Sequence, residues 1–164
     1  MGFSREMDAG GLLLCRYQAE IFDASLSLPC GSKEFIKRFV YSSFCWEFDS
    51  LAIASRPVDK EAYLESLRKL DLPSKGEKFK EEEMHWIGYI YRYWAYTDNI
   101  SSKKVYKMMP PAKIRPFFEA YHGLDPKQAI DIWKKEFHLV PTLDDMASVY
   151  GKIYKKGKPK FKKV

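Results

Sequence analysis

Cysteine is scarce in this chain of 164 residues, which contains only Cys15, Cys30 and Cys45. No two of them form a Cys-x-x-Cys pair, and three scattered cysteines suit neither a disulfide framework nor a structural zinc site. Cys15 and Cys45 stand among apolar neighbours, as small core residues do. We therefore predict a cytoplasmic protein with no metal and no other cofactor.

Long apolar runs are also missing. The run from Leu12 to Leu14 is too short for a secretory signal, and no stretch approaches the roughly 18 apolar residues of a membrane helix. Phosphate-binding glycine motifs and the Gly-x-Ser-x-Gly nucleophile motif do not occur, and His85 and His138 have no ligand partners at metal-binding spacing. The sequence thus predicts no membrane association and no familiar catalytic motif.

Hydrophobic residues make up 46% of the chain and aromatic residues 16%, which is ample for a folded core. The net charge is +6, but residues 151–164 hold seven lysines and no acid, so residues 1–150 carry a net charge of −1. We predict one helical domain over residues 1–150 and a basic, mobile tail over 151–164 that could attract nucleic acid.

Proline and glycine fall between segments of helical periodicity, and strand-like alternation is nearly absent. The fold class predicted is all-α: a compact single-domain bundle of about six to eight helices around a central aromatic helix at about 80–97. The helices are expected at about 11–26, 32–48 (with a possible extension to 54), 59–70, 80–97, 101–109, 112–121, 125–137 and 142–154. Their predicted N-caps are Ser32, Asp59, Ser101 or Ser102, Asp125 and Thr142.

The segment 80–97 has three glutamates in its first turn and aromatic residues on nearly all sides, which is typical of a central helix. Its residues Trp86, Ile90, Tyr93 and Trp94 share one face and are expected in the core. Tyr89 and Tyr96 lie on a different stripe and are candidates for an interface, because tyrosine is common in binding hot spots. If Arg92 is buried, it must have an acidic or carbonyl partner.

One alternative function is DNA binding. Residues 87–109 are arranged as helix, short turn and helix, and the second helix would enter the major groove of DNA. It would present Ser102, Lys103, Lys104 and Lys107 to phosphates. Plain packing of two helices produces the same pattern.

A second alternative is RNA cleavage. Arg115 and His122 have an Arg-x6-His spacing that is similar to that of some all-α ribonucleases of the higher-eukaryote-and-prokaryote nucleotide-binding class. There, arginine would stabilise charge and histidine would transfer a proton. The chain departs from that pattern at Pro116, and no second supporting acid is evident.

Three segments resemble a group of small all-α bacterial proteins: KEFIKRFVYSSFCWEFDSL at 33–51, EMHWIGYIYRYWAYTDNISSKKVYKMM at 83–109 and YHGLDPKQAIDIW at 121–133. That group is encoded in compact loci that resemble toxin–antitoxin modules, near genes resembling ADP-ribosyltransferases. The resemblance covers about residues 33–133 and transfers no catalytic residue. It implies an antitoxin-like or immunity-like binding role.

Taken together, these patterns predict a non-enzymatic protein-binding module that restrains a partner protein, such as a toxin encoded nearby. Exposed rings would anchor the partner and a neighbouring arginine would bridge to it. The residues predicted for this role are Tyr89, Tyr91, Arg92, Tyr96, Tyr121 and His122.

Overall fold

The computed structural model describes residues 4–55, 59–69 and 75–139. Within these ranges every regular element is a helix and no strand occurs, so the all-α prediction is confirmed. The chain divides into two units, one ending at Ala129 and one beginning at Ile130, and each is described separately. The predicted helix at 142–154 and the lysine-rich tail lie outside the described residues.

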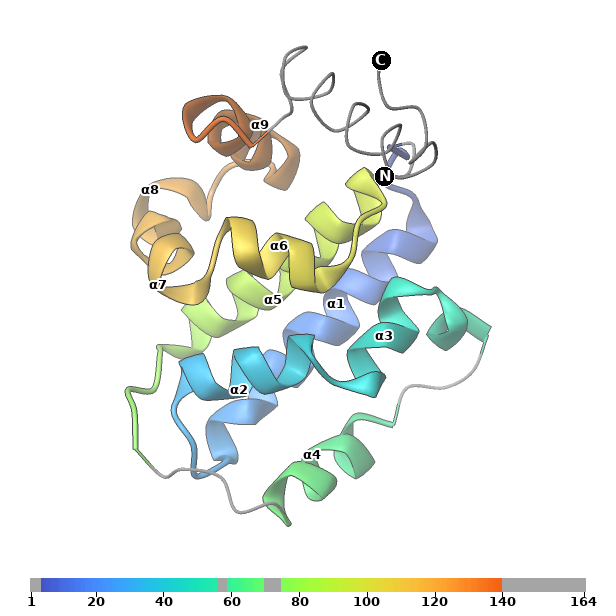
Figure 1. Ribbon diagram of the computed structural model, residues 1–164, viewed down its shortest axis with the longest axis vertical. Helices are drawn as coiled ribbons and strands as arrows, with labels where there is room; N and C mark the ends of the chain where they lie inside the picture. The colour runs from blue at the N-terminus through green and yellow to red at the C-terminus, as the bar shows by residue number, and fades with distance from the viewer. Residues whose placement is uncertain (1–3, 56–58, 70–74, 140–164) are drawn as a thin grey trace, which may run out of the picture. The chain divides into compact units, whose positions relative to one another are not determined.

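Helices α1 (Ala9–Ala24) and α5 (Glu81–Asp98) pack along each other at the middle of the first unit (Figure 1). Asp8 caps α1 by accepting a 2.8 Å hydrogen bond from the Gly11 amide. The two helices approach so closely at Gly88 that an added Cβ would lie 2.8 Å from the Phe22 ring. Helix α5 thus occupies the central position predicted for 80–97.

The predicted helix 32–48 is two helices, α2 (Ser32–Val40) and α3 (Ser43–Asp49). The chain breaks between them because the Ser42 hydroxyl caps α3, accepting a 3.1 Å hydrogen bond from the Cys45 amide. The 3-10 helices η1 (Ser25–Ser27) and η2 (Ala52–Ser55) follow α1 and α3. The prediction that Ser32 is an N-cap was wrong: Gly31 holds that position, and the Ser32 hydroxyl accepts a hydrogen bond from the Phe79 amide.

Two predicted caps are confirmed. Asp59 caps α4 (Lys60–Arg68) through a 2.9 Å hydrogen bond from the Ala62 amide. Ser101 caps α6 (Ser102–Met108), and Asn99 ends α5 in the left-handed region with φ of 54°. Helix α6 packs against α5 and lies beside α2 and α3 (Figure 1).

The predicted helix 112–121 is three short pieces: α7 (Pro111–Ile114), the 3-10 helix η3 (Arg115–Phe117) and α8 (Phe118–Tyr121). Pro116 lies at the change of geometry, because it has no amide hydrogen to continue an α-helical ladder. Helix α9 (Pro126–Glu136) begins after Asp125, whose carboxylate accepts a hydrogen bond from the Lys127 amide. Of the second unit, the structure describes residues 130–139, the end of α9 and the turn at His138.

The core of the first unit is rich in aromatic rings. Phe22 makes edge-to-face contacts with Phe35 and Phe39, whose ring centroids lie 5.3 and 5.2 Å away. The three cysteines are buried free thiols, as predicted for Cys15 and Cys45. In the parts of the chain that the structure describes, no helix is both long and apolar enough to cross a membrane.

Candidate functional site

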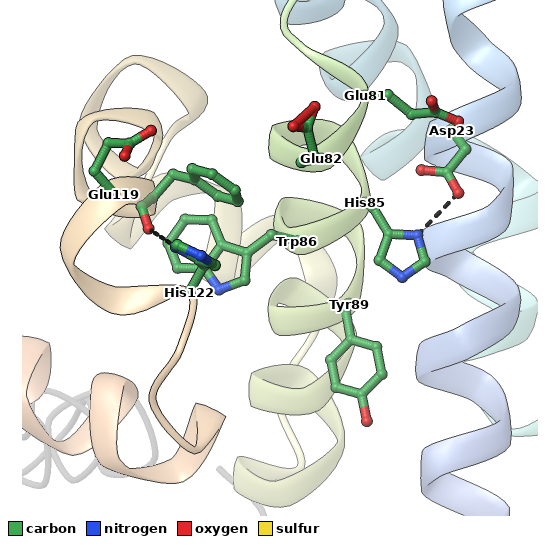
Figure 2. A pocket seen from close by; sticks show the side chains of 9 residues that line it. Asp23, Glu81, Glu82, His85, Trp86, Tyr89, Glu119 and His122 are labelled. Carbon is green, nitrogen blue, oxygen red and sulfur yellow. Dashed lines mark hydrogen bonds and ion pairs between the residues drawn. The ribbon is translucent and has the colours of Figure 1, made fainter.

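A cleft of about 690 Å³ opens on the outer side of α5, between α1 and α8 (Figure 2). The three helices contribute two histidines, four carboxylic acids and three aromatic rings. Its lining residues are Asp23, Glu81, Glu82, His85, Trp86, Tyr89, Phe118, Glu119 and His122.

Helical spacing on α5 builds the floor of the cleft. His85 and Trp86 stand three and four residues after Glu82, and Tyr89 stands four and three residues after them, so the four side chains lie on one face. The opposite face, which includes Ile87 and other buried residues, packs into the core. The predicted core position of Trp86 was therefore wrong, because its side chain is half-exposed in the cleft.

Each histidine is held by its Nδ1 atom. His85 Nδ1 lies 2.9 Å from Asp23 Oδ2, and His122 Nδ1 donates a 2.7 Å hydrogen bond to the Phe118 carbonyl. The His122 ring also stacks on the Phe118 ring at 4.3 Å. A ring that donates through Nδ1 and carries no second proton has Nε2 as its hydrogen-bond acceptor.

The lining of the cleft is acidic. Four carboxylates line it, and neither lysine nor arginine does. Glu81, Glu82 and Glu119 are exposed and form no ion pair with any described residue. Such a site attracts cations and repels phosphates.

Aromatic surface lies directly beside these acids. The Trp86 and Phe118 rings meet edge to face, with centroids 5.7 Å apart. Tyr89 is half-buried, and this burial raises the pKa of its hydroxyl. A cation in the cleft could therefore contact both a carboxylate and the face of a ring. Among the described residues, no group of three or more His, Cys, Asp and Glu is placed to hold a metal ion.

Two of the predicted partner anchors, Tyr89 and His122, meet in this cleft. Two others are half-exposed but lie outside its lining. Tyr121 packs its ring against Phe117. Tyr96 donates a 2.9 Å hydrogen bond to Asp8, and its ring lies under the Arg5 guanidinium. The side chain of Tyr96 is therefore already in contact with the N-terminal segment.

The last two predicted anchors are buried, which corrects the prediction for Tyr91 and Arg92. Tyr91 donates its hydroxyl hydrogen to the Met109 carbonyl. Arg92 is 1% exposed and lies 2.7 Å from Asp49, so the requirement for an acidic partner is confirmed. Neither side chain can reach a partner at the surface.

The residues of the DNA-binding alternative separate into two groups. Ser102 is 2% exposed and donates its hydroxyl hydrogen to Asp49, which removes it from any phosphate contact. Lys103, Lys104 and Lys107 are exposed on α6. Only these three remain available to a ligand.

Arg115 and His122 are not assembled into a catalytic pair. Arg115 forms ion pairs of 2.9 Å with Glu77 and 3.0 Å with Glu83, and its guanidinium covers the Phe79 ring. Burial by itself would lower the pKa of Arg115, and the hydrogen bonds to the two glutamates outweigh it and raise that pKa. His122 lines the cleft, whereas Arg115 does not.

Most of the cleft was not predicted. The acids Glu81 and Glu82 could be read as a helix start alone, and Asp23 stands 62 residues before its partner His85. The signal present in the sequence was the spacing of His85, Trp86 and Tyr89 after those acids. The chain matches no protein-family model, no curated protein and no solved structure.

Proposed function

We propose that the protein is a non-enzymatic module that binds a partner protein, and that its acidic cleft receives a basic segment of that partner. The observation that carries this proposal is the composition of the cleft: four carboxylates, three aromatic rings and no lysine or arginine among its lining residues. Cationic side chains are the complementary chemistry.

An arginine of the partner would fit this surface in two ways. Its guanidinium can form paired hydrogen bonds with a carboxylate such as Glu82 or Glu119, and it can stack on an aromatic face. Trp86 supplies that face one helical turn after Glu82, and Tyr89 supplies another about two turns after it. The volume of about 690 Å³ is within the range of sites that enclose a small ligand, and would hold one or two side chains rather than a folded domain.

The biological role we propose is antitoxin-like or immunity-like: by holding a basic segment, the protein occludes its partner in the cytoplasm. The resemblance of residues 33–133 to proteins of toxin–antitoxin-like loci supports this role. Three buried free thiols are compatible with a reducing compartment. The non-enzymatic character is supported by the ion pairs that hold Arg115 away from the cleft.

The test compares two double variants of the full chain. Glu82→Gln with Glu119→Gln removes two charges from the cleft, and Glu6→Gln with Glu61→Gln removes two charges from exposed positions elsewhere. Glu61 is a matched control because it stands in the first turn of α4, as Glu82 does in α5. Each protein is used as bait for the product of the adjacent gene, followed by titration calorimetry.

We expect the wild type and the control variant to bind that product with equal affinity. The cleft variant should bind at least tenfold more weakly, since each lost charge-assisted hydrogen bond is worth about 1.5–3 kcal/mol. If the partner is toxic when expressed alone, growth should be restored by the wild type and not by the cleft variant. Equal binding by all three proteins, or no binding by any, would refute the proposal.

A further inference from the structure

A second surface has the opposite chemistry. The tyrosine–lysine face comprises Tyr41, Tyr106, Lys103, Lys104 and Lys107, at the end of α2 and along α6. Tyr41 is 46% exposed although it is a large ring, and the three lysines are exposed. None of the three lysines forms an ion pair with a described residue.

The rings and the ammonium groups are in contact. The Tyr41 and Tyr106 rings meet edge to face with centroids 6.0 Å apart, and Lys103 Nζ lies 5.2 Å from the centroid of Tyr41. The exposed fraction of Tyr41 makes ring surface accessible, and the Lys103 ammonium lies over part of it. Because lysine has a flexible stem, its ammonium could move to a phosphate while a base takes its place on the ring.

We propose that the tyrosine–lysine face binds single-stranded nucleic acid. Non-specific binding of single strands combines aromatic rings, on which bases stack, with basic side chains that follow the phosphates. This function is independent of the acidic cleft, whose lining includes none of these five residues.

The geometry favours a single strand over a duplex. The Tyr41 and Tyr106 ring planes are inclined at 84° to each other. Bases stacked on both rings therefore cannot lie parallel to each other, as the stacked bases of a duplex do, whereas a flexible single strand can turn between them. Reading of the major groove uses the start of the second helix, and here Ser102 at that start is buried against Asp49.

The geometry also favours nucleic acid over a phosphorylated peptide. Recognition of a phosphorylated side chain commonly uses arginine forks. The arginine of α2, Arg38, is paired with Glu34 instead. The face supplies point charges and ring surfaces, which suit a chain of phosphates and bases.

The test measures the fluorescence anisotropy of a labelled oligothymidylate mixed with the full-length protein, as a function of salt. Tyr41→Ala should weaken binding about tenfold or more, because it removes one stacking platform. Lys103→Gln with Lys107→Gln should reduce the salt dependence, lowering the slope of log K against log salt by about 1 for each lysine. A duplex of the same length should bind more weakly than the single strand.

Two control variants keep this test specific. Tyr89→Ala removes a tyrosine from the cleft, and Lys69→Gln with Lys75→Gln removes two exposed lysines elsewhere. Both should bind the oligonucleotide like the wild type. Circular dichroism of each variant shows whether it is folded.

Three results would overturn the proposal. The first is equal affinity of Tyr41→Ala and the wild type for the single strand, which would assign binding to other basic parts of the chain. The second is equal or tighter binding of the duplex. The third is binding to phosphatidylserine vesicles that falls in the Tyr41 and lysine variants while none of the proteins binds the oligonucleotide, because the face would then be a membrane surface.

Discussion

Arg92 and Asp49 form an ion pair inside the core, with 2.7 Å between Nη1 and Oδ1. The rest of the guanidinium is also bonded: Nε donates to Gln18 at 2.9 Å, and Nη2 donates to Ser102 at 2.6 Å. Asp49 in turn accepts hydrogen bonds from the amide and hydroxyl of Ser102. One buried charge thus joins α1, α3, α5 and the start of α6.

The first prediction is that Asp49→Ala lowers the free energy of unfolding by about 3–5 kcal/mol, because it leaves Arg92 buried without its counter-charge. Urea denaturation measures the change. Lys60→Ala is the control, because it breaks an ion pair with Glu20 in which both side chains are more than a third exposed. Lys60→Ala should lower the free energy of unfolding by at most about 1 kcal/mol. Similar losses in the two variants would contradict the prediction.

The second prediction concerns Gly88, at the close contact of α1 and α5. A Cβ added there would lie 2.8 Å from Cγ of Phe22 and 3.1 Å from Cα of Ala19. Gly88→Ala should therefore destabilise the protein by about 1–3 kcal/mol, although alanine favours helix more than glycine does. Thermal unfolding followed by circular dichroism measures the loss.

Gly123→Ala is the matched control for Gly88→Ala. Nothing lies within 4 Å of a Cβ added at Gly123, and its φ is not in the left-handed region. This substitution should leave stability unchanged or raise it by up to about 1 kcal/mol. Equal melting temperatures for the two alanine variants would show that α1 and α5 can move apart at little cost.

Much of the fold could be predicted because its signals are local. Asp59 and Ser101 cap helices as expected, since an N-cap needs only its own side chain and the next few amides. The break at Ser42 was missed because no proline or glycine marks it, and the serine hydroxyl alone ends one helix and begins another. The sequence marks Pro116 as a departure from the ribonuclease pattern, and the structure shows that it also changes the helix geometry.

The site was harder to predict because burial depends on tertiary packing. Tyr89 and Tyr91 are two residues apart on one helix, yet the first lines a cleft and the second is 1% exposed. The sequence pattern shows their angular positions and does not show which neighbours cover them. Asp23 lies in the site because α1 packs against α5, a tertiary contact that the sequence pattern does not show.

The third prediction is that the Arg115–His122 pair has no ribonuclease activity. Arg115→Ala should lower the free energy of unfolding by about 1–2 kcal/mol, because it breaks ion pairs with Glu77 and Glu83 that are partly exposed. His122→Ala should change stability by less than about 1 kcal/mol. Cleavage of RNA by the wild type that is abolished in both variants would restore the catalytic interpretation.

The fourth prediction concerns alkaline pH. Burial raises the pKa of the Cys15 thiol from 9.0 to about 12 and that of Cys45 to about 11. Well below pH 9 both thiols are protonated in the folded and the unfolded chain, so these two groups add no pH dependence to the stability there. Above pH 9 the unfolded chain releases protons that the folded chain keeps, and each thiol lowers stability by up to about 1.4 kcal/mol per pH unit.

Urea denaturation at a series of pH values from 7 to 11 measures this effect. The free energy of unfolding should fall above pH 9, and it should fall less steeply in the double variant Cys15→Ala with Cys45→Ala. An identical slope in the variant would mean that other groups, such as Tyr63 with its pKa raised to about 12 by burial, account for the whole loss.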